Sequence, residues 1–291
     1  MTSKKNSSEI DLTEIREYHS SSGGLFFKVK NLLYSHRSPY QRIEVIENEY
    51  FGKMLLLDGL VQTTERDEFC YHEMLVHPAL ITHPSPKDIL IIGGGDGAAL
   101  KEILLYPVER LWLVEIDSQV IEASKNFFPW LSPALEDGRV ELTIADGEEF
   151  IHKINRKFDV VLVDSSDPVG PSSRLHEEDF YRDLKSRLNP EGVVVTQLGS
   201  PFYHLEELKK KSVFLDKIFE VARFYTGPVP SYPGGIWCYV YLSDKIDPLK
   251  LTREPPGGLK YFNQKIHKKA FSLPNFLKDK LELDEEDELR E

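Results

Sequence analysis

Residues 89–97 read Ile-Leu-Ile-Ile-Gly-Gly-Gly-Asp-Gly, and this stretch decides the fold. Its four apolar residues predict a buried strand, because the run is too short for a helix. The glycines then turn the chain, and residues 98–105 begin a helix. This order is typical of the nucleotide-binding corner of a doubly wound sheet, where Gly93 and Gly95 let the backbone approach a ligand. The alternative is a tight strand–helix turn without a ligand.

The next predicted strand, residues 111–114, ends at Glu115, which lies 22 residues after Gly93. A carboxylate at this strand end can accept hydrogen bonds from both hydroxyls of a ribose. An acid at a strand end can also simply be solvated, but the glycine corner before it favours the ribose interpretation. We therefore expect an adenosine-like ligand, either a dinucleotide or a sulfonium nucleoside.

The composition indicates a globular enzyme of 291 residues, 41% of them apolar, with a net charge of −12. The negative charge argues against nucleic acid as a partner. The sequence has no run of 18 apolar residues and no apolar N-terminal segment, so we expect neither a membrane span nor a secretory signal. Cys70 and Cys238 lack metal-ligand spacing and suggest a reducing compartment, the cytoplasm.

The chain divides into three predicted parts. Residues 1–24 are a polar N-terminal segment, and residues 25–67 form a small antiparallel β domain with a hairpin signal at Asp58-Gly59. Residues 68–291 form a Rossmann-like catalytic domain with a C-terminal tail. The fold class is thus α/β: a methyltransferase-like Rossmann domain, with a mostly parallel doubly wound sheet, preceded by a small antiparallel β domain.

The periodicity of apolar residues places the remaining elements. Helices are predicted over residues 65–82, 118–128, 177–188 and 205–219. Parallel strands are predicted over 140–144, 158–163 and 192–197, and closing antiparallel strands over 221–225 and 236–242. The aromatic tail, residues 261–276, is expected to pack back on the body.

Acidic residues follow several of the predicted parallel strands. Asp164 and Asp167 come after the strand of residues 158–163, and Asp96 belongs to the glycine corner. Ligands bind at this edge of open α/β sheets, and clustered carboxylates repel one another unless something cationic arrives. Asp146 also ends a strand, where it either accepts from an adenine amine or forms an ordinary Asp-Gly turn.

These motifs, in this order, resemble those of the polyamine aminopropyltransferases of the spermidine synthase family. The resemblance covers residues 24–276. It rests on Tyr40-Gln41, Asp58-Gly59, Thr-Glu-Arg-Asp-Glu-Phe at 64–69, Tyr-His-Glu-Met at 71–74, the glycine corner at 92–97, Val-Glu-Ile-Asp at 114–117, Ala-Asp-Gly at 145–147, Asp-Ser-Ser-Asp-Pro-Val-Gly-Pro at 164–171 and Pro-Ser-Tyr-Pro-Gly-Gly at 230–235.

The resemblance implies transfer of the aminopropyl group of decarboxylated S-adenosylmethionine, a co-substrate, to an amine, with release of methylthioadenosine. No permanently bound cofactor and no metal are expected, although the clustered acids alone leave Mg²⁺ as an alternative. Asp164 would be the proton acceptor, and Asp96 would bind the amine of the aminopropyl group. The nucleoside would be held by Gln41, Gly93, Gly95, Glu115, Asp146, Gly147 and Pro171. The acceptor tunnel would be lined by Tyr71, His72, Asp167, Gln197 and Tyr232.

These residue types suit that chemistry. A nucleophilic displacement beside a sulfonium needs alignment of amine, carbon and sulfur, and one amine without its proton. Carboxylates can bind the far ammonium and take the proton. Aromatic faces such as those of Tyr71 and Tyr232 suit the methylenes and cations of a diamine.

Several alternatives stay open. An S-adenosylmethionine-dependent methyltransferase would share the glycine corner, but Asp96 repels the methionine carboxylate. A nicotinamide dehydrogenase usually has the spacing G-x-G-x-x-G, which this corner matches in part. A polyamine-binding sensor would need the acids without the nucleoside pocket. Putrescine is the expected acceptor, with agmatine, cadaverine or a longer polyamine as alternatives, and the resemblance implies a homodimer or homotetramer.

Overall fold

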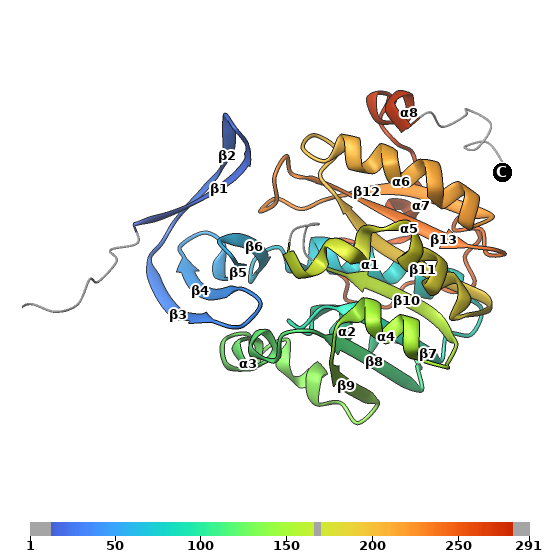
Figure 1. Ribbon diagram of the computed structural model, residues 1–291, viewed down its shortest axis with the longest axis horizontal. Coiled ribbons are helices and arrows are strands. Elements are labelled where there is room, and N and C mark those ends of the chain that lie inside the picture. The colour runs from blue at the N-terminus through green and yellow to red at the C-terminus, as the bar shows by residue number, and fades with distance from the viewer. Residues whose placement is uncertain (1–12, 166–169, 282–291) are drawn as a thin grey trace, which may run out of the picture.

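The computed structural model describes residues 13–165 and 170–281, with only the backbone described for residues 170–172. Within these residues the strands form three sheets, of two, four and seven strands (Figure 1). The two smaller sheets are antiparallel and precede the large, mostly parallel sheet in the chain. The fold class predicted from the sequence is therefore confirmed.

The seven-stranded sheet has the order β12-β13-β11-β10-β7-β8-β9. The strands are β7 (Asp88–Gly93), β8 (Arg110–Glu115), β9 (Val140–Ile144), β10 (Phe158–Asp164), β11 (Leu188–Gly199), β12 (Val221–Pro228) and β13 (Ile236–Ser243). β7 pairs in parallel with β8 and β10, whereas β13 pairs antiparallel with both of its neighbours. The predicted strands are thus present, and β11 extends beyond its predicted ends.

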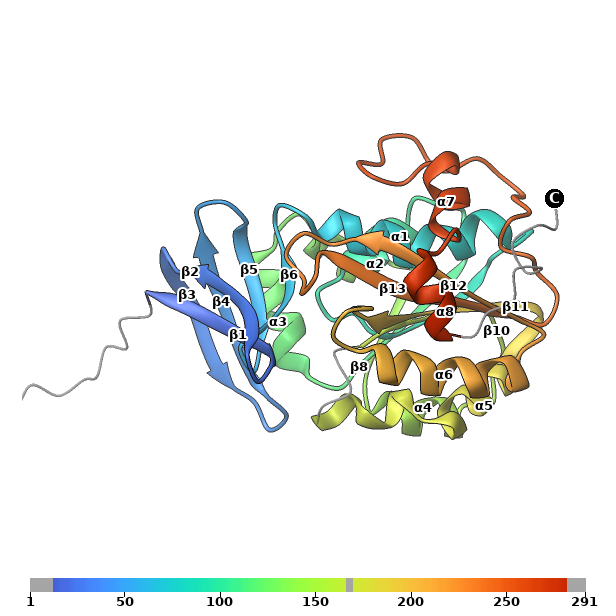
Figure 2. The same ribbon diagram turned by 90° about the horizontal axis from the view of Figure 1, so that it is seen from above.

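Helices cover both faces of this sheet (Figure 2). They are α1 (Glu68–Thr82), α2 (Ala98–Ile103) and α7 (Gln264–Ala270) on one face, and α4 (Gly147–Lys153), α5 (Glu178–Ser186), α6 (Leu205–Ile218) and α8 (Asn275–Leu281) on the other. Successive strand residues point to opposite faces, so Ile91 joins the core under α1 while Ile92 joins the core under α5. None of the helices in the described part of the chain is long and apolar enough to cross a membrane.

Helix α1 continues through Pro78 instead of breaking there. Proline has no N–H, so the carbonyl of Met74, four residues earlier, loses its helical donor. The hydroxyl of Tyr225 donates a hydrogen bond of 2.8 Å to that carbonyl. A side chain from β12 thus replaces the missing backbone donor in the helix that carries Tyr71 and His72.

The four-stranded sheet has the order β3-β4-β5-β6 and comprises β3 (Asn31–Arg37), β4 (Arg42–Asn48), β5 (Gly52–Leu57) and β6 (Leu60–Thr64). The predicted hairpin at Asp58-Gly59 joins β5 to β6, with positive φ at both residues. α3 (Ser118–Phe127) packs against β4, and Val45 and Leu55 share a core with Val120 and Phe128. This contact fixes the small sheet against the edge of the large one.

The predicted polar segment, residues 1–24, contains regular structure from residue 14 onward. β1 (Glu14–Ser20) and β2 (Gly23–Lys28) form an antiparallel hairpin there. Ile15 and Phe27 from this hairpin share a core with Met54 and Val61. The alternation along β1 escaped notice because one of its inward residues is the charged Glu17.

The C-terminal tail packs back on the body, as expected. Both carboxylate oxygens of Glu73 in α1 accept hydrogen bonds of 2.7–2.8 Å from the backbone N–H groups of Lys260, Tyr261 and Phe262. Phe262 then lies in the core beneath α1. These bonds tie the tail to the helix that supplies the site residues described next.

Candidate active site

A cavity of about 260 Å³ lies where the carboxyl ends of β7, β8 and β10 meet the small sheets. It brings together twelve of the fourteen predicted site residues: Gln41, Tyr71, His72, Gly93, Gly95, Asp96, Glu115, Asp146, Gly147, Asp164, Gln197 and Tyr232. Asp167 lies outside the described residues. Pro171 is described by its backbone alone, in the short helix η2 (Gly170–His176).

The glycine corner is fitted against the end of β10. Gly93 has φ of 84°, and a Cβ there would lie 2.1 Å from the carbonyl oxygen of Asp164. That same oxygen accepts a 3.0 Å hydrogen bond from the N–H of Gly94. Only glycine fits such an approach. The corner therefore holds Asp96 and Asp164 on the same rim.

Glu115 lies at the tip of β8, as predicted, and is buried. Its Oε1 accepts a 2.9 Å hydrogen bond from the N–H of Asp117. Burial raises the pKa of Glu115 to about 7, against backbone hydrogen bonds that lower it. Near neutral pH this carboxyl group is thus close to its titration midpoint, which makes its charge sensitive to a bound ligand.

Gln41 reaches this end of the cavity from the loop between β3 and β4. Its Nε2 donates 3.1 Å to Oδ2 of Asp117, which also accepts a 2.6 Å hydrogen bond from Ser38 Oγ. Asp117 was missed as a site-organising residue, since its partners lie more than 70 residues away in the chain. It couples the small sheet to the end of the cavity that Glu115 lines.

Asp146 and Gly147 start α4. Asp146 Oδ1 accepts hydrogen bonds from the N–H groups of Glu148 and Glu149, at 2.8 and 3.4 Å, so the carboxylate caps the helix. A Cβ on Gly147 would lie 2.3 Å from Cγ2 of Ile92. Asp146 is thus a helix N-cap, where the sequence suggested an Asp-Gly turn, and the residue also lines the cavity.

Asp164 ends β10 and faces Tyr71. The Tyr71 hydroxyl donates a 2.8 Å hydrogen bond to Oδ1 of Asp164. Burial raises the pKa of Asp164 to about 6; His72 and the Tyr71 hydrogen bond act against this, and Asp96 adds to it. The group is thus a stronger base than an ordinary aspartate while staying mostly ionised at neutral pH.

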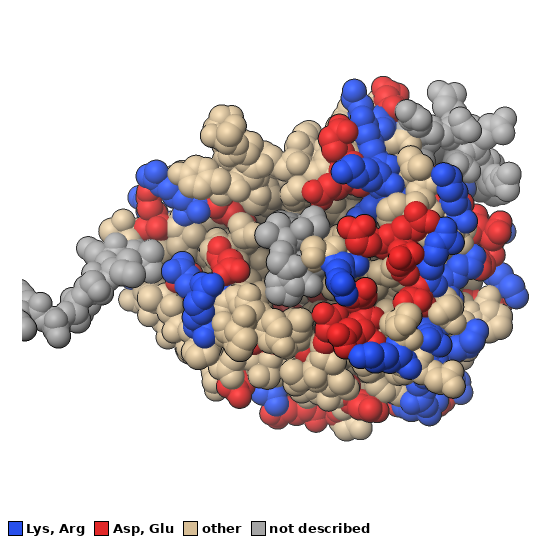
Figure 3. Space-filling view, viewed as in Figure 1, with Lys and Arg blue, Asp and Glu red and all other residues tan. Residues whose placement is uncertain are grey.

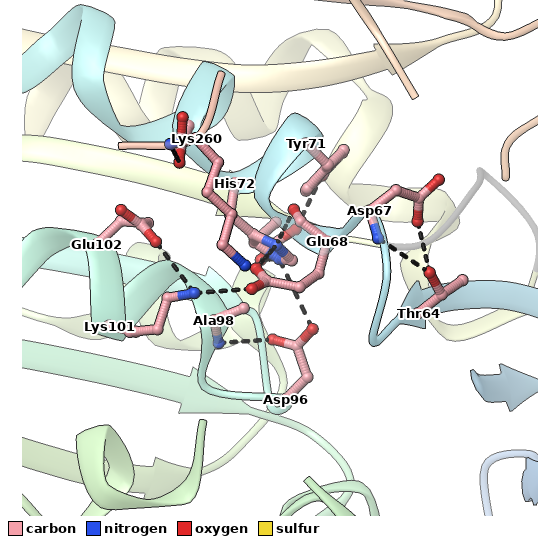
Figure 4. Close-up of polar contacts among 12 residues, drawn as sticks. Thr64, Asp67, Glu68, Tyr71, His72, Asp96, Ala98, Lys101, Glu102 and Lys260 are labelled. Carbon is pink, nitrogen blue, oxygen red and sulfur yellow. Dashed lines mark hydrogen bonds and ion pairs between the residues drawn. The ribbon is translucent and has the colours of Figure 1, made fainter. Parts of the chain in front are cut away.

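His72 lies between the carboxylates of Asp96, shown in Figure 4, and Asp164. Its Nε2 is 3.6 Å from Oδ2 of Asp96 and 3.8 Å from Oδ2 of Asp164, and its Nδ1 donates 2.9 Å to the backbone carbonyl of Glu68. Burial disfavours the charged ring, but Asp96, Glu68 and Asp164 outweigh it and raise the pKa of His72 to about 9. The site thus holds one imidazolium against two facing acids.

Glu68 and Lys101 extend this group of charges on the Nδ1 side of His72. Neither was predicted as a site residue from the sequence. Glu68 Oε2 lies 3.5 Å from His72 Nδ1, and Lys101 Nζ lies 2.7 Å from Glu68 Oε1 (Figure 4). Burial favours the neutral acid, but the His72 and Lys101 cations lower the pKa of Glu68 to about 2. The sequence shows both residues on helices without indicating that they meet.

His72, Asp96 and Asp164 each offer one ligand atom, all within 4.8 Å of one another. A divalent metal would need the imidazole nitrogen to be unprotonated. The raised pKa of His72 instead keeps both ring nitrogens protonated at neutral pH. A divalent metal that bound here would thus have to displace a proton from the ring.

Aromatic rings and one amide form the opposite wall. The Tyr232 ring lies 5.7 Å from that of Tyr71 and 4.7 Å from that of Trp237. Gln197 donates 2.9 Å to the Ser165 carbonyl and accepts 3.0 Å from Trp237 Nε1, so both ends of its amide bind protein groups. The faces of the rings make this wall apolar. The Gln197 hydrogen bond holds the backbone of Ser165, the residue after Asp164.

The loop that carries Tyr232 is fastened to the start of α1. Asp67 accepts hydrogen bonds from Thr64 Oγ1, Ser231 N and Ser231 Oγ at 2.6–3.0 Å. The Tyr232 hydroxyl donates to the backbone carbonyl of Gln62. The aromatic wall is thus held at both of its ends.

The fold and this cavity define the class of the protein. It is a Rossmann-like α/β protein with a cavity lined by carboxylates. Comparison with known proteins makes this specific. Residues 68–251 match the family model described as "Spermine/spermidine synthase domain", and residues 15–65 match "Spermidine synthase tetramerisation domain". The chain is 44% identical over 261 residues to a polyamine aminopropyltransferase of Shouchella clausii, covering 89% of this chain and 95% of the relative.

Another relative and two solved structures agree. A polyamine aminopropyltransferase of Methanocaldococcus jannaschii is 41% identical over 272 residues, covering 90% of this chain and 93% of the relative. A crystal structure of spermidine synthase with the transition-state analogue AdoDATO has a TM-score of 0.88 at 39% identity, with 94% and 96% of the two chains covered. Spermidine synthase from Thermotoga maritima has a TM-score of 0.88 at 38% identity, with 94% and 95% covered.

The chain therefore belongs to the spermine/spermidine synthase family of polyamine aminopropyltransferases, and it is an enzyme.

Proposed function

We propose that this enzyme transfers the aminopropyl group of decarboxylated S-adenosylmethionine to putrescine, giving spermidine and methylthioadenosine. One observation carries the proposal: Asp96 and Asp164 share the His72 imidazolium in a cavity that also holds the glycine corner and Glu115. Such a site can take a nucleoside at one end and exchange its internal cation for the ammonium groups of two substrates.

The nucleoside end supports a sulfonium nucleoside. Glu115 would accept hydrogen bonds from the ribose. The remaining polar atoms would be surrounded by Gln41, Asp146, Gly147 and the backbone at Gly93, Gly95 and Pro171. Asp96 would bind the primary ammonium of the aminopropyl group. S-Adenosylmethionine carries a carboxylate near that ammonium, and the charge of Asp96 would repel it.

The acceptor end supports an alkylamine beside Asp164. The amine nitrogen attacks the carbon next to the sulfonium, the carbon–sulfur bond breaks, and sulfur keeps the electron pair as a thioether. The nitrogen becomes a secondary ammonium and gives its proton to Asp164. Tyr71 and Tyr232 would flank the methylenes, and Gln197 and Asp167 would complete the tunnel.

We also propose a homodimer or homotetramer in the cytoplasm. The match of residues 15–65 to a tetramerisation domain supports self-association, as do Tyr18 and Phe26 on the β1–β2 hairpin, whose side chains are 67% and 64% exposed. Light scattering after gel filtration tests the assembly. Cys70 and Cys238 are unpaired thiols, as in proteins of reducing compartments. Basic and acidic side chains are mixed on the face shown in Figure 3, which offers no continuous basic patch for nucleic acid.

The test is methylthioadenosine release from decarboxylated S-adenosylmethionine with single amines. Putrescine should give the highest kcat/KM in a panel with agmatine, cadaverine and spermidine, and mass spectrometry should find spermidine. S-Adenosylmethionine in the same assay is the control for a methyltransferase. Methyl transfer, or release that ignores the added amine, would contradict the proposal.

A further inference from the structure

The small β domain reaches the cavity through the loop between β3 and β4. Gln41 lies on this loop and lines the cavity together with Glu115 at the end of β8. Asp117, at the start of α3, contacts both of these residues without lining the cavity itself. Its side chain is buried, with 2% of the residue exposed. A buried carboxylate thus joins the loop to the Rossmann-like domain.

Both oxygens of the Asp117 carboxylate accept hydrogen bonds. Oδ1 accepts a 3.1 Å hydrogen bond from the N–H of Gln119 and so caps α3. Oδ2 accepts 2.6 Å from Ser38 Oγ and 3.1 Å from Gln41 Nε2. Ser38 Oγ in turn accepts from the N–H groups of Tyr40 and Gln41, both at 3.1 Å, which leaves its own proton for Asp117. Every group that faces the carboxylate is therefore a donor.

This contact decides which end of the Gln41 amide faces Asp117. An ionised carboxylate only accepts hydrogen bonds, so the amide presents its NH2 group there and its carbonyl oxygen lies at the other end. That oxygen, Oε1, accepts no hydrogen bond from residues 13–165 or 170–281. Because Gln41 lines the cavity, Oε1 is a place where a ligand can donate.

Asp117 also holds the second acceptor of this end of the cavity. Its backbone N–H donates a 2.9 Å hydrogen bond to Oε1 of Glu115. Part of the hydrogen-bonding capacity of Glu115 is thus already used by the protein, and the Gln41 carbonyl is a further acceptor nearby. Two neighbouring acceptors fit a ligand with two adjacent hydroxyl donors, such as a ribose.

We infer that Asp117 is a positioning residue for ribose recognition: it turns the Gln41 amide so that Oε1 accepts from one ribose hydroxyl while Glu115 accepts from the other. The inference rests on the proposed use of a sulfonium nucleoside and deepens it, because it makes nucleoside affinity depend on how the small β domain is docked. Asp117 touches no substrate. Its loss should therefore raise the KM of decarboxylated S-adenosylmethionine and leave kcat within about twofold of wild type.

Asp117→Asn tests the orientation without changing the size of the side chain. Asparagine caps helices as well as aspartate does, so its oxygen can stay with the N–H of Gln119 while its NH2 group faces Gln41. The Gln41 amide should then turn over and direct its NH2 group into the cavity. Affinity for methylthioadenosine should fall by about 3–10-fold, the ordinary cost of one hydrogen bond. Glu122→Gln, which removes one exposed charge from the same helix, is the matched control and should bind normally.

The 2′-deoxy and 3′-deoxy analogues of methylthioadenosine separate a turned amide from general damage to the cavity. Each lacks one donor, so wild type should bind each of them at least about threefold more weakly than methylthioadenosine. In Asp117→Asn this penalty should shrink to about twofold or less for the analogue without the hydroxyl that Gln41 binds, and persist for the other. Calorimetry measures all these affinities without turnover. Unchanged penalties, or an equal loss of both, would overturn the inference.

Exchanging the two side chains keeps the inference testable if Asp117→Asn fails to fold. Gln41→Glu alone places a second carboxylate against Asp117 and should lose at least as much affinity. The double variant Gln41→Glu/Asp117→Asn has the net charge of wild type, and the introduced amide can donate to the introduced carboxylate, whose other oxygen faces the ribose. The Ser38 hydroxyl can then donate to the backbone carbonyl of residue 41, 3.1 Å away. Affinity should return to within about threefold of wild type, whereas losses that add would refute the contact.

These measurements also distinguish the inference from the proposed function. A wild-type enzyme that binds no methylthioadenosine would contradict the proposed function and the inference with it. A wild-type enzyme that binds methylthioadenosine and releases it during aminopropyl transfer, but whose Asp117→Asn variant keeps the same preferences among the three nucleosides, would contradict the positioning role of Asp117 alone.

Discussion

The Tyr71 hydroxyl donates a 2.8 Å hydrogen bond to one oxygen of Asp164, so the two carboxylate oxygens have different surroundings. Oδ1 is held by Tyr71, while Oδ2 faces the His72 imidazolium at 3.8 Å. A base held on one side by a neutral donor and on the other by a displaceable cation is ready for a substrate ammonium.

Asp164→Asn removes the proposed proton acceptor at the end of β10. We expect kcat to fall by about 10²–10⁴-fold, the range for losing a general base. Affinity for methylthioadenosine should barely change, because the nucleoside end does not use this carboxylate. Steady-state kinetics and calorimetry measure the two effects. Asp183→Asn, on the surface helix α5, is the control and should keep full activity; an Asp164→Asn enzyme with normal kcat would refute the assignment.

Tyr71→Phe should move the acid side of the pH profile. The attacking amine must be unprotonated, so log kcat/KM for the amine rises with pH. Below the pKa of Asp164 this carboxylate is protonated as well, so log kcat/KM should fall more steeply as the pH decreases. In wild type this break is expected near the pKa of Asp164, about 6. The Tyr71 hydrogen bond lowers that pKa, so its loss should shift the break to higher pH. A break that stays in place would separate Tyr71 from the base.

Asp96→Asn should weaken the choice between the two sulfonium nucleosides. Asp96 accepts from the N–H of Ala98 through Oδ1 and faces the cavity through Oδ2. Its charge should favour decarboxylated S-adenosylmethionine over S-adenosylmethionine by about 2–5 kcal/mol in wild type. Calorimetry with both nucleosides should show most of this difference lost in the variant. Asp88→Asn, at the opposite end of β7, is the control, and equal affinities in the wild type would show that Asp96 has another role.

Methylthioadenosine binding should depend on the charge of Glu115. The pKa of the buried carboxyl group is about 7 in the free site, and a ribose is best bound by the ionised form. Affinity should therefore be highest above pH 7 and fall by up to about tenfold per pH unit below it. Methylthioadenosine carries no amine that titrates in this range, so the effect belongs to the protein. Glu115→Gln should bind weakly at every pH, with a flat profile between pH 6 and 8.

Local sequence patterns were sufficient for one part of the site. The glycine corner, Glu115 and Asp164 each lie at the end of an apolar strand, and parallel strands bring their carboxyl ends to one edge. Their proximity follows from topology without any detailed packing. The helix with Tyr71 and His72 was likewise visible from its periodicity.

Other features depend on contacts that the sequence does not display. Glu17 was missed because a buried charged residue breaks the apolar alternation of β1. Asp117 gains its role from Ser38 and Gln41, on a distant loop. The charge of His72 depends on Glu68, Asp96 and Asp164, which come from different elements. Burial and long-range electrostatics together, rather than residue type, decide these three cases.

The charge on His72 should make stability fall as the pH rises above neutrality. Its pKa is about 9 in the folded protein, above the ordinary value of 6.5. A raised pKa stabilises the folded state fully below pH 6.5, and this contribution is lost as the pH rises through 9. The facing groups are Glu68 on α1, Asp96 after β7 and Asp164 on β10, with the Tyr71 ring alongside.

Glu68→Gln removes one of these acids without touching the cavity-facing pair. The pKa of His72 should fall. Burial favours the neutral ring, and fewer negative charges then oppose this effect. The free energy of unfolding should drop by about 1–3 kcal/mol at pH 7, and the loss of stability should begin at lower pH. Urea unfolding between pH 6 and 9.5, with imidazole titration by NMR, measures both. His72→Gln identifies the resonance and should abolish this part of the pH dependence. Arg16→Gln, on the exposed side of β1, is the control, and a Glu68→Gln protein with an unchanged His72 titration would show that the charge is set by Asp96 and Asp164 alone.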